Sequence, residues 1–151
     1  MRTILSLLSL LLVARGALAQ SLPGPPFAEP AQPPKIVYLL CKGAVWSHEN
    51  GFGASASTPG ATTIRIDPGA RMATFQVLIL GEMQGELKAS DEAYFSHAAL
   101  ARPLLHMGRS ITAVELNVNR FTGRASIAYL LADGGQHPAF AGDCQPASPK
   151  F

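Results

Sequence analysis

The chain has 151 residues, enough for one small domain, and its 12 Lys and Arg stand against 10 Asp and Glu. Arg2 and Arg15 belong to an N-terminal segment that we expect to be removed, so the mature chain carries no net formal charge. The remaining basic residues are scattered singly, which argues against binding to nucleic acid and against electrostatic attachment to a membrane.

Residues 1–19 have the pattern of a secretory signal peptide. Arg2 supplies the positive n-region, residues 4–13 form an apolar stretch too short to span a bilayer, and residues 17–19 form a small-residue cleavage pattern. Cleavage would leave Gln20 first, and because this residue is not Cys there is no attachment point for a lipid anchor. We expect a soluble periplasmic or secreted protein without a membrane span.

Residues 20–35 form a Pro-rich leader that contains six of the 12 prolines. Proline cannot donate to a sheet ladder and breaks helices, so we expect this leader to be disordered. A docking peptide in polyproline II conformation is the alternative. A single β domain with a short C-terminal tail is then expected at residues 36–151.

Alternating apolar and polar residues predict strands in the first half of this domain. Residues 36–41 are rich in strand formers, and residues 62–66 place Thr and Ile on one face. An Asp-Pro-Gly turn at residues 67–69 leads to a second alternating stretch at residues 73–79, which predicts a hairpin. Residues 51–60, rich in Gly, Ser and Ala, are expected to form a loop.

Residues 81–108 carry no motif that assigns them a role. Residues 92–98 predict a further short strand. Within residues 98–108 an Ala-rich stretch favours helix while Pro103 would interrupt it, so we expect a single helical turn.

A second hairpin is the clearest local prediction. Residues 112–118 place Thr112 and three apolar residues on one face, and residues 125–131 repeat the period after a turn. In that turn Asn119 can accept backbone hydrogen bonds and Gly123 can adopt a left-handed conformation. Together the two hairpins predict an all-β fold, a small antiparallel barrel or sandwich of about six to eight strands.

The tip of the second hairpin carries the candidate binding residues Arg120 and Phe121. Binding residues concentrate on loops that a rigid scaffold positions, although exposed side chains at a turn are more often simply solvated.

Cys41 and Cys144 are the two cysteines of the chain and lie near opposite ends of the domain. In an oxidising compartment this arrangement predicts one buried structural disulfide, which would hold the tail after Ala141 beside the first strand. The two Cα atoms should then lie about 4.4–6.8 Å apart. A redox role has no support, because there is no Cys-x-x-Cys pair.

The sequence shows no recognisable catalytic or metal-binding motif. Its four histidines lack the spacing that places two ring nitrogens on one metal, and no glycine-rich phosphate loop or nucleophile elbow is present. Ser47 precedes His48 and Ser96 precedes His97, but catalytic groups are assembled by the fold and not by adjacency. We expect no enzyme, no metal and no cofactor.

Several features together resemble small exported proteins of proteobacteria that have no assigned function. They are the signal peptide, the Cys-Lys-Gly of the first strand, Ile-x-Ile-Asp at residues 64–67, the turn at residues 119–123 and the tail from Cys144 to Phe151. The resemblance implies a periplasmic location and no particular activity.

We therefore expect a monomeric binding or interaction module that presents its loops or an edge to a protein or to a small apolar ligand. The alternative is an inhibitor of an extracytoplasmic hydrolase, which would insert residues 51–60 or the Arg120 and Phe121 tip into an active site. A hydrolase that uses Ser47 or Ser96 with a histidine ranks last.

Overall fold

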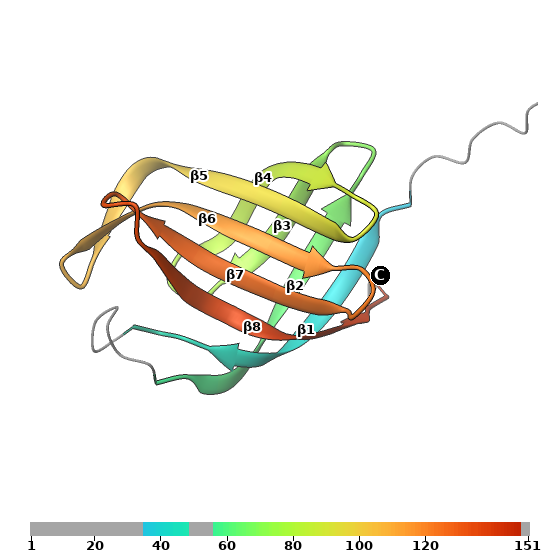
Figure 1. Cartoon of the computed structure of the whole chain (residues 1–151), viewed down its shortest axis with the longest axis horizontal. Helices are drawn as coiled ribbons and strands as arrows, with labels where there is room; N and C mark the ends of the chain where they lie inside the picture. Colours follow the sequence, from blue (N-terminus) through green and yellow to red (C-terminus); the bar gives the residue numbers. More distant parts are fainter. Residues whose placement is uncertain (1–34, 49–55, 149–151) are drawn as a thin grey trace, which may run out of the picture. The chain divides into compact units, whose positions relative to one another are not determined.

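A computed structural model describes residues 35–48 and 56–148, which form a closed antiparallel barrel (Figure 1). Each strand pairs with its neighbours in chain order, and β8 returns to β1. The strands are β1 Val37–Val45, β2 Thr58–Asp67, β3 Met72–Val77, β4 Gly81–Ala89, β5 Ala93–His106, β6 Arg109–Asn119, β7 Arg124–Leu131 and β8 Gln136–Pro146. The expected all-β antiparallel fold is confirmed, and it is a barrel.

Some of the sequence-based expectations lie outside the described residues. They are the signal peptide, the leader apart from Lys35, residues 51–55 of the expected loop, and Phe151. Residues 58–60, which we expected in that loop, belong to β2 instead. The part of the chain that the structure describes contains no helix able to cross a membrane.

Inward-facing apolar side chains form the core of the barrel. On β7 the buried residues alternate as predicted: Ala125, Ile127, Tyr129 and Leu131 are all at most 4% exposed. On β6 the predicted alternation holds from Val114 to Val118, but Thr112 is not part of the core. A bulge between Ile111 and Ala113 shifts the register against β7, so Ile111 turns into the core in place of Thr112.

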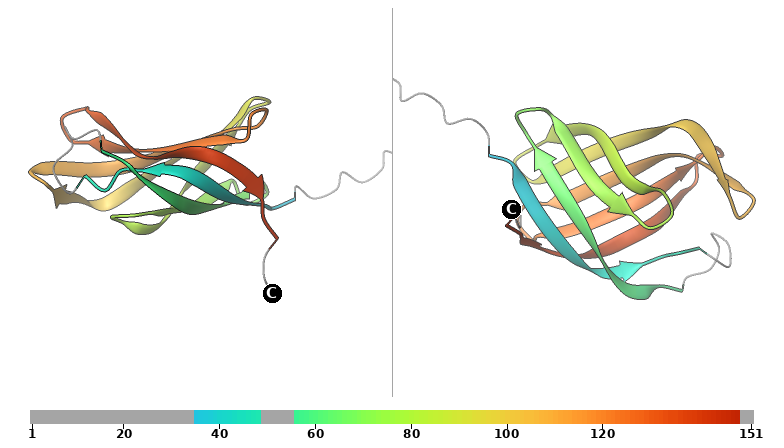
Figure 2. Two further views of the ribbon diagram at one scale, coloured as in Figure 1. Left: turned by 90° about the horizontal axis from the view of Figure 1, so that it is seen from below. Right: turned by 180° about the vertical axis from the view of Figure 1, so that it is seen from behind.

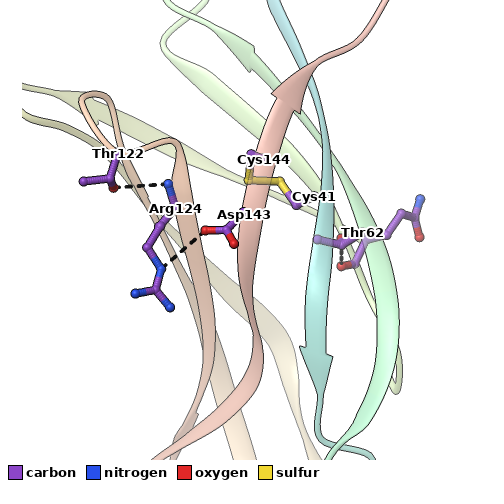
Figure 3. The surroundings of a disulfide bond; sticks show 7 residues. Cys41, Thr62, Thr122, Arg124, Asp143 and Cys144 are labelled. Atoms are coloured by element: carbon purple, nitrogen blue, oxygen red, sulfur yellow. Dashed lines mark hydrogen bonds and ion pairs between the residues drawn. A yellow bond between two sulfur atoms is a disulfide. The ribbon is translucent and has the colours of Figure 1, made fainter.

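The barrel is closed by the pairing of β1 with β8, and the disulfide lies at this junction (Figure 3). Cys41 stands opposite Cys144 with their Cα atoms 3.9 Å apart, so the predicted bond is present but its Cα separation is shorter than expected. Cys41 is fully buried in the barrel core.

The chain after Ala141 lies beside the first strand, as predicted. The expectation that it could not dock without the disulfide was wrong, because β8 continues to Pro146 and pairs with β1. Gly43 faces Gly142 across this pair, and a Cβ on either would collide with the partner's backbone. The backbones of β1 and β8 thus come into direct contact at these glycines, and this contact holds the tail in place without apolar side chains.

The expected helical turn within residues 98–108 is also absent, because β5 continues to His106. Ala99 pairs with Ala113 and Leu104 with Ile111, so residues 100–103 of β5 bulge against a single residue of β6. Pro103 lies in this bulge, where its missing N–H breaks no ladder bond.

We call the end of the barrel where β1, β3, β5 and β7 finish the loop end, and the opposite end, which holds residues 35 and 148, the tail end. Between two pairs of neighbouring strands the hydrogen-bonded ladder does not reach the loop end, and we call each such line of contact a seam. The β2–β3 ladder runs only from Ile64 with Phe75 to Asp67 with Met72, and the β4–β5 ladder begins at Glu86 with His97. Seen from behind, the β3–β4 hairpin diverges from β2 toward the loop end (Figure 2).

We predict that the disulfide contributes substantially to stability. Its sequence separation of 103 corresponds to a stabilisation of up to about 4–5 kcal/mol in the chain-entropy model. The Cys41→Ser/Cys144→Ser variant should therefore show a lower free energy of unfolding in urea by about 2–5 kcal/mol. A loss below about 1 kcal/mol would show that the β1–β8 ladder closes the barrel without covalent help.

Candidate functional site

A cavity of about 440 Å³ opens at the loop end, between β2 and the end of β3. Its lining comes from six strands and the β3–β4 turn: Val45, Thr58, Pro59, Gly60, Ala61, Thr62, Gln76, Val77, Leu78, Gly81, Ile127, Ala139 and Phe140. Val77, Ile127 and Phe140 are at most 4% exposed and also belong to the barrel core. The cavity therefore reaches the interior of the barrel, and we call it the loop-end cavity.

Two of the three polar side chains that line the loop-end cavity, Thr62 and Gln76, are already engaged with protein groups. The Thr62 hydroxyl donates to the backbone carbonyl of Gln76 at 2.7 Å. The Gln76 side-chain amide donates to Glu82 Oε2 at 3.3 Å. What remains for a ligand is the exposed Thr58 side chain and a wall in which apolar surface exceeds polar surface.

Two polar rings lie near this end of the core. His48 is 4% exposed, and its Nε2 lies 2.6 Å from the carbonyl oxygen of Pro138. The same ring meets the edge of Tyr129 with centroids 5.8 Å apart. Burial raises the pKa of Tyr129 to about 12, opposed by a backbone hydrogen bond at Ile79. Tyr129 therefore remains a neutral phenol at physiological pH.

Arg120 and Phe121 lie at the tail end, away from this cavity. The Arg120 guanidinium packs over the ring of Tyr94 at 5.0 Å and donates to the carbonyl of Ser90 at 2.7 Å. Its backbone N–H donates to the carbonyl of Glu92 at 2.8 Å. Arg120 therefore joins the β6–β7 turn to the β4–β5 turn, a structural task that the sequence did not predict.

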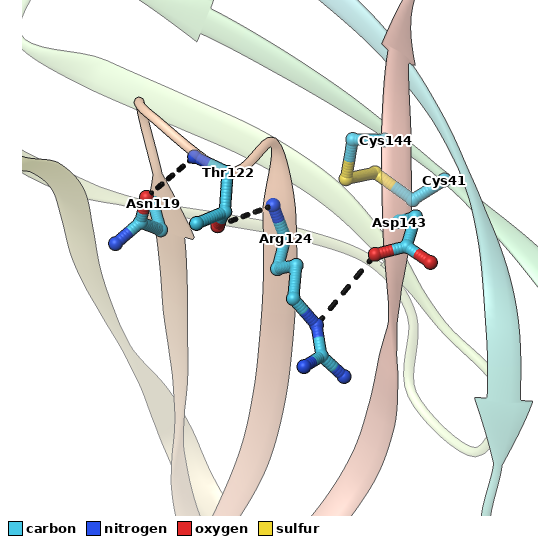
Figure 4. A network of polar contacts seen from close by, with 6 residues as sticks. All are labelled: Cys41, Asn119, Thr122, Arg124, Asp143 and Cys144. Atoms are coloured by element: carbon cyan, nitrogen blue, oxygen red, sulfur yellow. Dashed lines mark hydrogen bonds and ion pairs between the residues drawn. A yellow bond between two sulfur atoms is a disulfide. The ribbon is translucent and has the colours of Figure 1, made fainter.

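Phe121 is 77% exposed on a well-braced turn. Asn119 Oδ1 accepts the N–H group of Phe121 at 3.0 Å, as predicted for this turn. It also accepts the N–H group of Thr122 at 2.8 Å (Figure 4). Gly123 has a φ of 69°, which supports its predicted left-handed conformation. Arg120 and Phe121 also line a tail-end hollow of about 430 Å³.

A third hollow, of about 540 Å³, lies along the β2–β3 seam beside residues 147 and 148. Its lining includes Arg65, Thr63 and Glu82. Arg65 is paired with Asp67 at 2.7 Å, and its side chain is 37% exposed. Charged side chains therefore take part in the lining of this hollow and not in that of the loop-end cavity, although apolar atoms form the larger share of its surface.

The two Ser-His neighbours occupy different environments. Ser96 is fully buried, and its Oγ has no hydrogen-bond partner among the described residues. His97 follows it on the opposite face of β5, half exposed, with Nδ1 3.6 Å from Glu115 Oε1. Adjacency in sequence thus places this pair on opposite sides of the barrel wall. Ser47 is partly buried beyond the end of β1.

In the described part of the chain, no three His, Cys, Asp or Glu side chains come together as metal ligands. No protein-family model matches the chain, and no curated protein or solved structure shows significant similarity to it.

The raised pKa of Tyr129 predicts a pH dependence of stability. A pKa of about 12 in the fold against an ordinary 10.0 means that the fold favours the protonated phenol. This stabilisation is complete below pH 10 and is lost as the pH rises toward 12. Between these pH values the free energy of unfolding of the wild type should fall by about 2 kcal/mol more than that of Tyr129→Phe, which has no phenol to ionise. Parallel losses in urea titrations of both proteins would contradict the burial of the phenol.

Proposed function

We propose that the protein is an exported binding module that holds a small apolar ligand in the loop-end cavity. The observation that carries the proposal is the cavity itself, because fully buried core side chains form part of its wall. Antiparallel barrels of eight strands have an interior that is either filled by side chains or holds one small ligand.

Size and chemistry support the same ligand class. A volume of about 440 Å³ lies within the usual range of small-molecule sites. Thr62 and Gln76 already bond to protein groups, so a ligand would gain mainly from burial of apolar surface. A neutral apolar molecule fits this lining better than an ion, whose desolvation nothing in the wall would offset.

The proposed export rests on the signal-like residues 1–19 and on the disulfide. Disulfides persist in oxidising compartments and are rare in the cytosol. A carrier in the periplasm or outside the cell would have access to apolar molecules that partition poorly into water.

Binding is tested with the neutral dye N-phenylnaphthylamine, whose fluorescence rises in apolar surroundings. Thr58 is exposed at the rim of the loop-end cavity, so Thr58→Trp can fill the rim without disturbing the core. We predict that this variant weakens dye binding by at least about tenfold, whereas Thr63→Trp on the outer face of β2 binds as the wild type does.

The two variants also separate competing sites. A loss confined to Thr63→Trp would place the ligand in the outer hollow, which Thr63 lines. Equal binding by the wild type and both variants would exclude the loop-end cavity. Melting temperatures near that of the wild type are the control for folding.

The rigid, exposed Phe121 favours a second candidate function, inhibition of an extracytoplasmic hydrolase by insertion of the tip. The test is a panel of secreted proteases and glycosidases assayed with the wild type and with Phe121→Ala. We predict that any inhibition found is lost in the variant, whose stability should change by less than about 0.5 kcal/mol because the side chain is exposed. Inhibition that survives the substitution would exclude the tip.

A further inference from the structure

We infer that the distal part of the β3–β4 hairpin, residues 76–85, is a movable wall through which ligand enters the loop-end cavity. The inference rests on the proposed binding function and adds the path by which ligand enters the cavity and the contacts that limit its rate of entry. We call this segment the flap.

The flap lacks the lateral pairing that holds the rest of the barrel wall. In the described chain the β2–β3 ladder stops at Phe75, and the β4–β5 ladder starts at Glu86. Within the flap Gln76 pairs with Glu82 and Val77 with Gly81. Residues 83–85 pair with residues 73–75 of β3 and lack ladder partners on the β5 side. By contrast, β1 pairs with β2 along its whole length and with β8 from Leu39 to Val45.

The flap is also a wall of the cavity. Gln76, Val77, Leu78 and Gly81 line it, facing the β2 residues from Thr58 to Thr62 across the seam. Val77 is 4% exposed and packs in the core, whereas Leu78 beside it is 65% exposed. Displacement of the flap would therefore widen the cavity directly at the short β2–β3 seam.

Side-chain contacts hold the flap where ladder bonds are missing. On the β2 side the Thr62 hydroxyl donates to the Gln76 carbonyl at 2.7 Å (Figure 3). On the inner side, Ile79 and Leu80 in the turn of the flap pack against the core cluster. A few such contacts can break together at lower cost than a full ladder, because local opening requires much less free energy than global unfolding.

The base of the flap has a natural pivot at Gly85. A Cβ there would collide with the backbone of His97 and with Ser96 Oγ, so β4 crosses β5 in close contact at this residue. Paired strands resume immediately beyond it, at Glu86 with His97. Motion of the flap can therefore remain local while the rest of the barrel stays closed.

The test compares two variants. Thr62→Val removes the hydroxyl that bonds β2 to the flap, and Thr63→Val changes the neighbouring residue on the outer face. Loss of one hydrogen bond should raise the open population about fivefold. We therefore expect association and dissociation of N-phenylnaphthylamine to be about fivefold faster in Thr62→Val, with a smaller change in Kd, and wild-type rates in Thr63→Val. Association and dissociation rates in Thr62→Val equal to those of the wild type would overturn the proposal that the flap opens to admit ligand.

Hydrogen exchange keeps this result separate from the binding proposal. If the dye does not bind the wild type, the proposed function fails. A movable flap would still give faster exchange of the amides in residues 78–85 of Thr62→Val. The Leu116 amide in the middle of the barrel should keep its wild-type rate. Exchange rates in residues 78–85 of Thr62→Val equal to those of the wild type would exclude a movable flap.

A crosslink provides a second variant if Thr62→Val does not fold. Thr63→Cys/Gln76→Cys joins β2 to the flap beyond the end of their ladder, while Arg65→Cys/Thr74→Cys joins the same strands at an existing pair. The first crosslink should slow dye association at least tenfold and the second should leave it unchanged. Equal association in both crosslinked proteins would contradict entry through this seam.

Discussion

Closure of the sheet by β1 and β8 is the constraint on which the rest of the structure depends. Once β8 pairs with β1, every inward position faces a common interior, and apolar side chains at alternate positions can form one core. The disulfide joins the same two strands, with Cys41 inside that core and Cys144 packed against it. Closure also removes the exposed sheet edges, except where neighbouring strands separate locally.

Local separation and access to the interior therefore occur at the same place. The β2–β3 seam is short, and the loop-end cavity opens beside it, with Thr62 bonded to Gln76 where the ladder has ended. A side-chain hydrogen bond can be broken without disturbing the closing β1–β8 pair. The barrel can thus remain stable as a whole while one wall of its cavity moves.

The sequence predicted much of the fold because period-two alternation and turn chemistry are local properties. The β6–β7 hairpin, the Asn119 turn and the disulfide followed from residue types and spacing. The helical turn near Pro103 was wrong because a bulge depends on the register with a partner strand, which composition does not reveal. The self-docking of β8 was missed for a similar reason, since it depends on Gly43 and Gly142 meeting across two strands.

The candidate site was less accessible to prediction. Val77, Ile127 and Phe140 each look like an ordinary core residue in sequence, and only the fold shows that they border a hollow. A binding role for Arg120 at the turn stays a prediction; the structure adds the contacts of its side chain with the Tyr94 ring and the Ser90 carbonyl. Neither the distant lining nor this intramolecular contact leaves a local signal in the chain.

Nuclear Overhauser effects between N-phenylnaphthylamine and methyl-labelled protein test the central claim most directly, because they locate the bound molecule. The account predicts contacts from the dye to the methyl groups of Val77 and Ile127, which line the loop-end cavity. Contacts to Val37 and Leu39 at the tail-end hollow would contradict it. So would the absence of any methyl contact with the dye at saturating concentration.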